Sequence, residues 1–446
     1  MLGTFTYLAV LLAVIVGSVL RPPIALAGVL ILFGLKQWGQ NASPWLAQYP
    51  LLTNVAIGVV TLVAVLRAAF KRGCLFCSMP PAEICAIGLF LYALVTLTWS
   101  LDLESGLANW VYVAPYLIVV VLMAPLVVDD LEGLRTTFVW TALLGGGLCF
   151  LAVVFGTWGY RGLAVTQTAP IGSLLDRGPQ IFETNPLALA SLGGTVMVAG
   201  STFLLERRAT LLRVLAACAL PFALAVIIRS GSRGQLVAAL PALFLAASVA
   251  FKLRGFRSWA VLGLLSMLIV GMGWWATSLV EVNKSRWLGS ELAEGDVEGR
   301  FEMAAAVLDA AVTHPLAMFI GLGNSSSFKL LGIYPHITIL EVLAEEGLPG
   351  IALYLAVLFY AARSVRRAAR ALTDEPRPRV ALGILAGLFL YELLLSWKQG
   401  SLLGSQFVFC FAFLLGRLEL ALNAAPHRRP ATLEQVPVRA FPNLLT

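Results

Sequence analysis

Charged residues are scarce in this chain: Asp, Glu, Lys and Arg together make up 12% of its 446 residues. A soluble domain carries about 25% charged residues. The hydrophobic share here is 59%, and the mean hydropathy is +0.87. A globular core cannot bury this much apolar surface, so lipid must surround most of the chain. The composition excludes a soluble enzyme with a single membrane anchor.

Alternation of apolar and polar residues, which is typical of a membrane β-barrel, is also lacking. The apolar segments instead run for roughly 20 residues at a time, the length of a membrane-spanning helix. We therefore predict an all-α, polytopic membrane protein with about 12 transmembrane helices. The first apolar run, 5–36, contains Arg21-Pro22-Pro23, which can break a helix, and this leaves the N-terminus unplaced.

Two further absences limit the chemistry. The six Cys are scattered, and the single Cys74-x-x-Cys77 pair is weak support for zinc or redox chemistry. No Asp-x-Asp pair falls in the segments predicted to face outward, so we expect no metal and no cofactor. In a membrane protein, we interpret the net charge of +7 as basic residues that set the orientation of the chain rather than as a nucleic-acid-binding surface.

Basic residues predict how the chain is oriented. If the C-terminus is cytoplasmic and spans are counted backward, most Lys and Arg fall on the cytoplasmic side, as the positive-inside rule requires. The predicted organisation is then transmembrane helices 1–9 in residues 1–280 with a short periplasmic loop at 158–184, a large periplasmic loop at 281–347, transmembrane helices 10–12 in 348–422, and a cytoplasmic tail at 423–446. Amphipathic patterns from Arg300 and from Thr338 to Glu346 predict a helical periplasmic cap in the large loop.

Several arginines lie on the outward side, against the positive-inside tendency. In Arg229-Ser-Gly-Ser-Arg233, small residues let a ligand approach two guanidinium groups, whose planar forks suit phosphate oxygens. This turn fits a pyrophosphate carried on a lipid. Contact with lipid headgroups or helix capping is the alternative.

Histidine is rare, with only three in the chain, and His336 begins the helical pattern that leads to the next span. A neutral imidazole at the mouth of an aqueous pocket can take a proton from a sugar hydroxyl. A purely structural histidine is the alternative. His314 precedes Pro315 at a predicted helix end, where capping is the expected role.

Four short motifs, in order along residues 177–350, resemble those of the O-antigen ligase and polymerase family of bacterial inner membranes. The chain differs at Ile337 and Leu187, where the family often has Asn. The matching residues are Arg177 with Asn185-Pro186; Ser232-Arg233-Gly234; Arg300 followed by His314-Pro315-Leu316 and Gly321-Leu-Gly323-Asn324; and His336-x-x-x-Leu340-Glu341 with Gly347 and Gly350.

The resemblance implies an inner-membrane glycosyltransferase of the C-type architecture with its active site facing the periplasm. It implies transfer of glycan from undecaprenyl pyrophosphate to a sugar hydroxyl of lipid A–core, inverting and without metal. The partners would be the lipid-linked O-antigen, lipid A–core and the bilayer. Catalytic roles would fall to His336, Arg233 and Arg300, and substrate binding to Arg177, Arg229, Arg286, Arg161 and Asn185.

Other functions stay open at this point. Within the family, an O-antigen polymerase or a protein O-glycosyltransferase would use the same donor chemistry. A polyprenyl-lipid transporter is the alternative of another class, with the arginines as a substrate path. Buried acidic residues inside spans are scarce, Glu392 being the main one, which disfavours a proton-coupled carrier.

Overall fold

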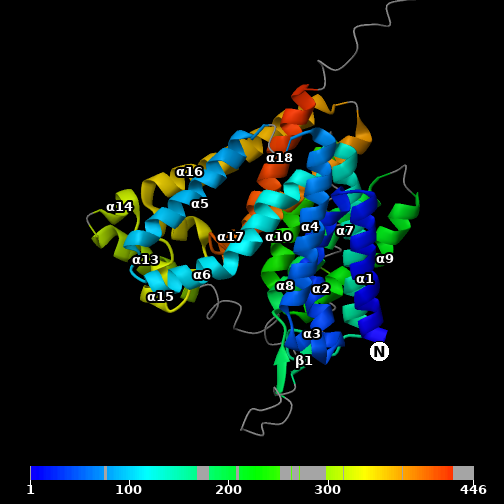
Figure 1. Ribbon diagram of the computed structural model, residues 1–446, viewed down its shortest axis with the longest axis horizontal. Coiled ribbons are helices and arrows are strands. Elements are labelled where there is room, and N and C mark those ends of the chain that lie inside the picture. The colour runs from blue at the N-terminus through cyan, green and yellow to red at the C-terminus, as the bar shows by residue number, and fades with distance from the viewer. Residues whose placement is uncertain are drawn as a thin grey trace, which may run out of the picture.

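The computed structural model describes residues 2–74, 78–167, 180–206, 210–251, 298–314, 316–373 and 375–424, together with Gly263 and Gly271. Within this part the chain is helical apart from one two-stranded sheet (Figure 1). Eleven described helices are long and apolar enough to cross a membrane. The expectation of an all-α, multi-pass membrane protein is confirmed.

The N-terminal run predicted as one span, 5–36, is instead two helices. These are α1 (Leu2–Leu20) and α2 (Pro23–Ala42), followed by α3 (Pro44–Gln48) and α4 (Leu51–Arg72). Pro22 and Pro23 lack the backbone N–H that would continue α1, and Pro is favoured in the first turn of a new helix. α2 is 20 residues long but is not among the eleven helices that are apolar enough to cross a membrane, because its second half is polar. The predicted span 258–280 lies outside the described residues, except for Gly263 and Gly271.

The middle of the chain contributes five long spans and a hairpin. The elements are α5 (Pro81–Thr96) with η1 (Leu97–Trp99), α6 (Leu103–Tyr116) continued by η2 (Leu117–Met123) and η3 (Ala124–Val127), α7 (Leu131–Val154), β1 (Ala164–Gln167), β2 (Gln180–Glu183), α8 (Pro186–Leu204) and α9 (Thr210–Arg229). The strands pair antiparallel, with Ala164 opposite Glu183 and Gln167 opposite Gln180.

The C-terminal half holds the most buried of the eleven candidate spans, α17. It consists of α10 (Arg233–Phe251), α13 (Glu298–Thr313), α14 (Ala317–Ile320), α15 (Ser326–Leu331), α16 (Thr338–Ala371), α17 (Pro376–Gln399) and α18 (Gln406–Ala424). In α17, 78% of an 18-residue apolar stretch is buried inside the protein, against 22% in α1. α17 is therefore central, whereas α1 presents apolar side chains to lipid. The predicted helix that starts near Arg300 is α13, and the one from Thr338 to Glu346 is the first part of α16.

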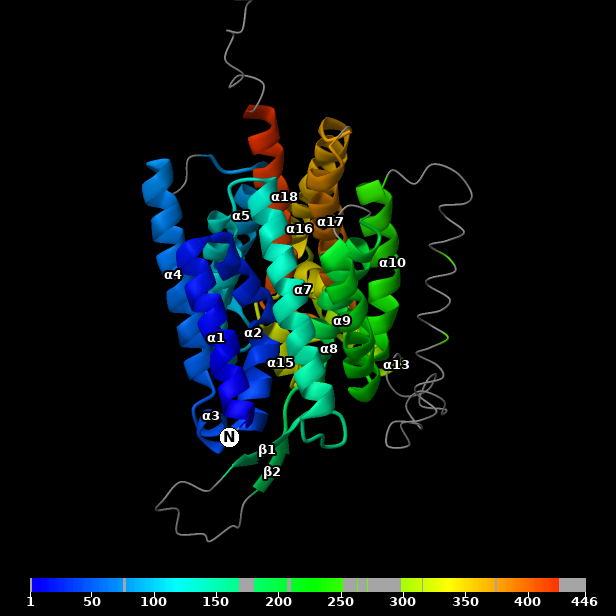
Figure 2. The ribbon, with the colours of Figure 1, turned by 90° about the vertical axis from the view of Figure 1, so that its right-hand side faces the viewer.

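The bundle has two distinct ends (Figure 2). The N-terminus and the β1–β2 hairpin lie at one end, called here the hairpin end, and α18 finishes at the other, called the tail end. Because successive spans reverse direction, α10 begins and α17 finishes toward the hairpin end. The residues predicted to form the site can therefore gather there.

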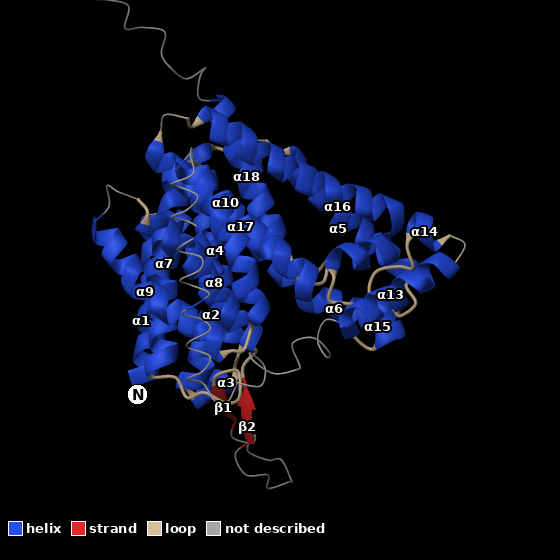
Figure 3. Ribbon diagram, turned by 180° about the vertical axis from the view of Figure 1, so that it is seen from behind, coloured by secondary structure: helices blue, strands red, loops and turns tan. Residues whose placement is uncertain are grey.

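Helices α5, α6 and α16 lean away from the main bundle, and α13, α14 and α15 lie against them (Figures 1 and 3). A small apolar cluster of its own holds this region together, made of Val307, Ala311, Ala317, Leu322 and Ala344. The segment predicted as a cap is thus ordered and helical where it is described, and it packs to one side of the bundle.

Candidate active site

The α9–α10 turn is a buried, tight connection. Ser230 and Ser232 are 0% and 2% exposed, and Gly231 between them has φ +64°, a conformation that favours glycine. Arg233 starts α10 and is half-buried. Its Nη1 and the neighbouring Ser232 Oγ are buried, and neither has a hydrogen-bond partner in the described part of the chain. Buried donors are normally satisfied, so this pair is prepared for a ligand that supplies acceptor oxygens.

A second turn, residues 158–163, packs against the first. The Arg161 Nε donates to the Ser230 carbonyl oxygen at 3.0 Å. The Arg229 guanidinium carbon lies 5.6 Å from the centre of the Trp158 ring, within cation–π range. The contacts bring Arg161, Arg229 and Arg233 to one place.

The Glu183 carboxylate holds this second turn in shape from the end of β2. It accepts the backbone N–H groups of Tyr160, Arg161 and Gly162. Burial raises the pKa of the carboxyl, but the three N–H donors outweigh it, so the pKa of Glu183 is lowered from its ordinary value. Glu183 therefore positions Arg161 while ionised.

A fourth cation comes from the last turn of α17. The Lys398 side chain lies against Gly234, so closely that a methyl group on this glycine would overlap it. The next residue of α10, Gln235, accepts a hydrogen bond from Tyr391 of α17. We call Arg161, Arg229, Arg233 and Lys398 the cationic cluster.

The same end of α17 holds the segment that carries His336. Thr338 Oγ1, at the first residue of α16, donates to the Ser396 carbonyl oxygen at 2.9 Å and lies 3.2 Å from Ser405 Oγ. Glu341 accepts the Leu402 N–H at 3.2 Å. Ser396 is thus tied to the start of α16, and Lys398, two residues on, contacts α10. Short contacts link the His336 segment to the cationic cluster.

His336 itself has an unusual backbone. Its φ is +61°, in the left-handed region, and it precedes α16 by two residues. Its ring packs edge to face on Tyr334, with centroids 4.4 Å apart, and the side chain is partly exposed. Left-handed backbone at a non-glycine residue costs energy and persists where surrounding contacts impose it, often at functional sites.

Two carboxylates in the first part of α16 organise the loop before it. The Glu345 carboxylate accepts the N–H groups of Ser325 at 2.6 Å and Ser327 at 2.8 Å, and Glu346 accepts Asn324 Nδ2 at 2.7 Å. Asn324 Oδ1 in turn accepts Trp110 Nε1 of α6 at 2.9 Å. A neighbouring carboxylate of α16, Glu341, instead binds Leu402 in the loop between α17 and α18.

Two glycines allow the first part of α16 to approach residues 321–327 closely. Gly321 and Gly347 have φ +84° and +64° and pack backbone against backbone. The kink at Gly347 separates the first turns of α16 from its long apolar part. The sequence points to the glycines through the family motif, but it does not show that the neighbouring glutamates hold the 324–327 backbone.

Of the remaining predicted site residues, the structure describes some and leaves others outside the described part of the chain. Asn185 caps α8: its Oδ1 accepts the Leu187 N–H at 2.9 Å, and its carbonyl oxygen accepts Gln37 Nε2 at 2.8 Å. Its exposed side chain is thus engaged in capping, and sugar contact by Asn185 stays a prediction. Arg177 and Arg286 lie outside the described residues, and Arg300 lies in α13 with its side chain outside the description. His314 follows the last residue of α13, as expected, and its carbonyl oxygen accepts the Ala317 N–H.

Residues 216–355, which contain Arg229, Arg233, Arg300 and His336, match a protein-family model described as O-antigen ligase. Over this segment the chain is similar to the O-antigen ligase family. The match supports a glycosyltransferase-like function of the ligase and polymerase type in a multi-pass membrane protein. A comparison with curated proteins finds no match. Two contributors to the cationic cluster, Arg161 and Lys398, lie outside the matched segment.

Proposed function

We propose that the protein is an O-antigen ligase, which transfers glycan from undecaprenyl pyrophosphate to a sugar hydroxyl of lipid A–core on the periplasmic face of the bacterial inner membrane. The observation that carries the proposal is the unpartnered pair of Arg233 Nη1 and Ser232 Oγ, beside Arg161 and Arg229. Burying donors without acceptors costs about 1–3 kcal/mol each. A pyrophosphate at this turn would supply the missing acceptors and the opposite charge.

The reaction needs only modest chemical assistance from the protein. The acceptor oxygen attacks the anomeric carbon as the bond from that carbon to the pyrophosphate oxygen breaks, and the electron pair leaves with undecaprenyl pyrophosphate. Guanidinium groups stabilise the charge that develops on the leaving group. Attack opposite the leaving group inverts the anomeric configuration.

His336 takes the proton of the acceptor hydroxyl in this proposal. Its partly exposed ring stands at the start of α16, and the Thr338–Ser396 contact connects that start to the Lys398 end of α17. Arg300, in α13, is assigned to the same catalytic set, and Arg177, Arg286 and Asn185 to glycan or pyrophosphate binding. Metal is not required, since arginines supply the positive charge.

The test is reconstitution. Purified protein, lipid-linked O-antigen and lipid A–core are combined in proteoliposomes without an ion gradient, with and without EDTA, and the products are separated on a gel. A ladder of glycan on lipid A–core in both samples is expected. Longer lipid-linked chains would indicate a polymerase, glycan on protein an O-glycosyltransferase, and movement of donor without product a transporter. Loss of activity with EDTA, restored by magnesium, would contradict the arginine mechanism.

A further inference from the structure

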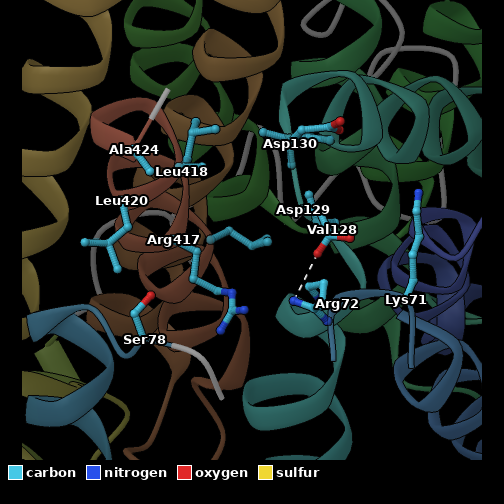
Figure 4. Close-up of a pocket in the computed structure, with 13 residues that line it drawn as sticks. Lys71, Arg72, Ser78, Val128, Asp129, Asp130, Arg417, Leu418, Leu420 and Ala424 are labelled. Atoms are coloured by element: carbon cyan, nitrogen blue, oxygen red, sulfur yellow. Dashed lines mark ion pairs between the residues drawn. The ribbon is translucent and has the colours of Figure 1, made fainter. Parts of the chain in front are cut away.

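Charged and uncharged side chains join the spans at different places in the bundle. At the tail end, beside a hollow of about 690 Å³, Arg72 of α4 pairs with Asp129 at 3.0 Å (Figure 4). Next to the cationic cluster, α10 and α17 are instead joined by Gln235 and Tyr391, called here the uncharged pair. A carboxylate in this place would bring a negative charge close to Arg233, where the proposed donor has to bind its pyrophosphate.

The Gln235 side chain has both ends of its amide engaged. It is fully buried in the first turn of α10, two residues after Arg233. Its Oε1 accepts a hydrogen bond from the hydroxyl of Tyr391 in α17, and its Nε2 donates to the carbonyl oxygen of Leu187 in α8 at 3.3 Å. A single side chain therefore connects the start of α10 to two other spans.

Tyr391 lies where these three helices meet. It is fully buried, and a methyl group on Gly194 of α8 would overlap its hydroxyl. Lys398 follows Tyr391 by about two turns of α17, so both side chains project from the same side of that helix. They meet consecutive residues of α10, because Lys398 lies against Gly234 and Tyr391 bonds to Gln235. One side of α17 thus contacts the first turn of α10 at two points.

Farther from the cluster, α10 and α17 pack through small residues. Gly383 of α17 lies against Ala246 and Ala250 of α10, and Gly387 lies against Ala242 and Ala246. Small residues let two helix backbones approach closely, but apolar contact has no preferred direction. A hydrogen bond requires a narrow range of distance and angle. The uncharged pair therefore fixes the rotation and height of α10 against α17 at the end where the cluster lies.

We propose that Gln235 and Tyr391 are positioning residues for the donor: their bond holds Arg233 and Lys398 at a fixed spacing, so that both cations contact the pyrophosphate. This inference rests on the proposed ligase function, because the ligand concerned is the donor of that reaction. In this role neither residue touches the reacting atoms. Cations that are held in place before the donor arrives lose less freedom when it binds, and binding is tighter for that reason.

The test measures the kinetics of ligation and the thermal unfolding of the purified full chain. Tyr391→Phe removes only the hydroxyl, and a second variant combines it with Gln235→Leu, which removes both polar groups of the pair together. Tyr7→Phe is the matched control. The Tyr7 hydroxyl lies 2.9 Å from Thr53 Oγ1 in a buried contact between α1 and α4, far from α10 in the bundle (Figure 2).

We expect both variants of the uncharged pair to raise the KM for lipid-linked O-antigen by about three- to tenfold, as loss of a hydrogen bond implies. The KM for lipid A–core should stay unchanged. Tyr7→Phe should keep both KM values while its thermal unfolding shifts by a similar amount. An unchanged donor KM in Tyr391→Phe, equal increases in both KM values, or the same donor effect in Tyr7→Phe would overturn the proposal. A wild type that forms no product would instead overturn the proposed function, and this inference with it.

Discussion

The Arg233 guanidinium is half-buried at the first residue of α10 and keeps one nitrogen without a partner among the described residues. A structural arginine in such a place would normally bond to carbonyl or carboxylate oxygens. The adjacent Ser232 hydroxyl is in the same condition. In the proposed reaction a bound substrate supplies the acceptors for these two neighbouring groups, which stand on a backbone fixed by Gly231.

Arg233→Lys tests whether the fork geometry matters. Lys keeps the charge but loses the planar set of donors, so ligation should fall by about tenfold or more, in line with about 1.5–3 kcal/mol for a hydrogen bond to a charged group. Initial rates of product formation measure this. Arg213→Lys at the tail end serves as control and should be unchanged. Full activity in a well-expressed Arg233→Ala would show that this turn only contacts lipid headgroups.

At this scale the sequence predicted the basic turn and the histidine, and it missed their supports. Arg229, Arg233 and His336 stand out because their residue types and neighbours are unusual. Lys398 and Glu183 do not, because their importance depends on contacts across long stretches of chain, to Gly234 and to residues 160–162. Local spacing cannot show such contacts.

At the scale of elements, the 158–163 turn relies on one carboxylate at the end of β2. Glu183→Gln keeps the size of the side chain but removes the charge that its three N–H partners favour. The turn should loosen around Arg161, and ligation at pH 7 should fall several-fold. Initial rates compare it with Glu132→Gln, an exposed residue in the first turn of α7 at the tail end, which should behave like the wild type.

The pH dependence has a defined sign. Because the folded-state pKa of Glu183 is lowered, its contribution to stability is fully present above the ordinary pKa of a glutamate and is lost as pH falls through the lowered pKa. The wild-type turn should thus stay ordered between pH 7 and pH 5. A wild-type rate no higher than that of Glu183→Gln across this range would refute the positioning role.

The close packing of the Gly321 backbone against Gly347, called here the glycine junction, can be tested separately. Gly321→Ala would place a methyl group onto the Glu345 carbonyl oxygen in addition to the positive φ of +84°. Gly332 has a similar φ of +72° but open space around it, so Gly332→Ala carries only the backbone penalty of about 1–2 kcal/mol. Thermal unfolding in detergent should show a clearly larger loss for Gly321→Ala. Equal shifts would mean that the junction relaxes without cost.

Hydropathy predicted the all-α, multi-pass nature of the chain because lipid imposes a minimum length on each membrane-spanning helix. It merged α1 and α2 because both are apolar and only a two-residue break separates them. It gave no sign of the β1–β2 hairpin, whose strands are four residues each and rest on pairing rather than on composition.

For the whole molecule, orientation is the main open proposal. The segment 281–347 is proposed as periplasmic and the tail 423–446 as cytoplasmic, because the ends of the neighbouring spans toward the tail end are basic. The structure adds that Arg21, left unplaced by the sequence, lies at the turn between α1 and α2 toward this basic end, since α1 begins at the hairpin end.

Cysteine labelling in intact spheroplasts tests this topology in a background without native cysteines. Lys329 and Thr373 are exposed and lie on opposite sides of the α16 span, so Lys329→Cys and Thr373→Cys form a matched pair. An impermeant maleimide should label only Lys329→Cys. Labelling of Thr373→Cys alone would invert the topology and place the cationic cluster in the cytoplasm.

The central claim is that His336 acts on the acceptor while the arginines hold the donor, and one paired measurement on the purified protein tests it. Binding of lipid-linked O-antigen and the rate of ligation to lipid A–core are measured for wild type, His336→Ala and Arg233→Ala. Loss of a general base costs about 10²–10⁴-fold in rate. His336→Ala should lose that much turnover and keep wild-type donor affinity, whereas Arg233→Ala should lose both. Near wild-type turnover in His336→Ala, or donor binding as weak as in Arg233→Ala, would contradict the account.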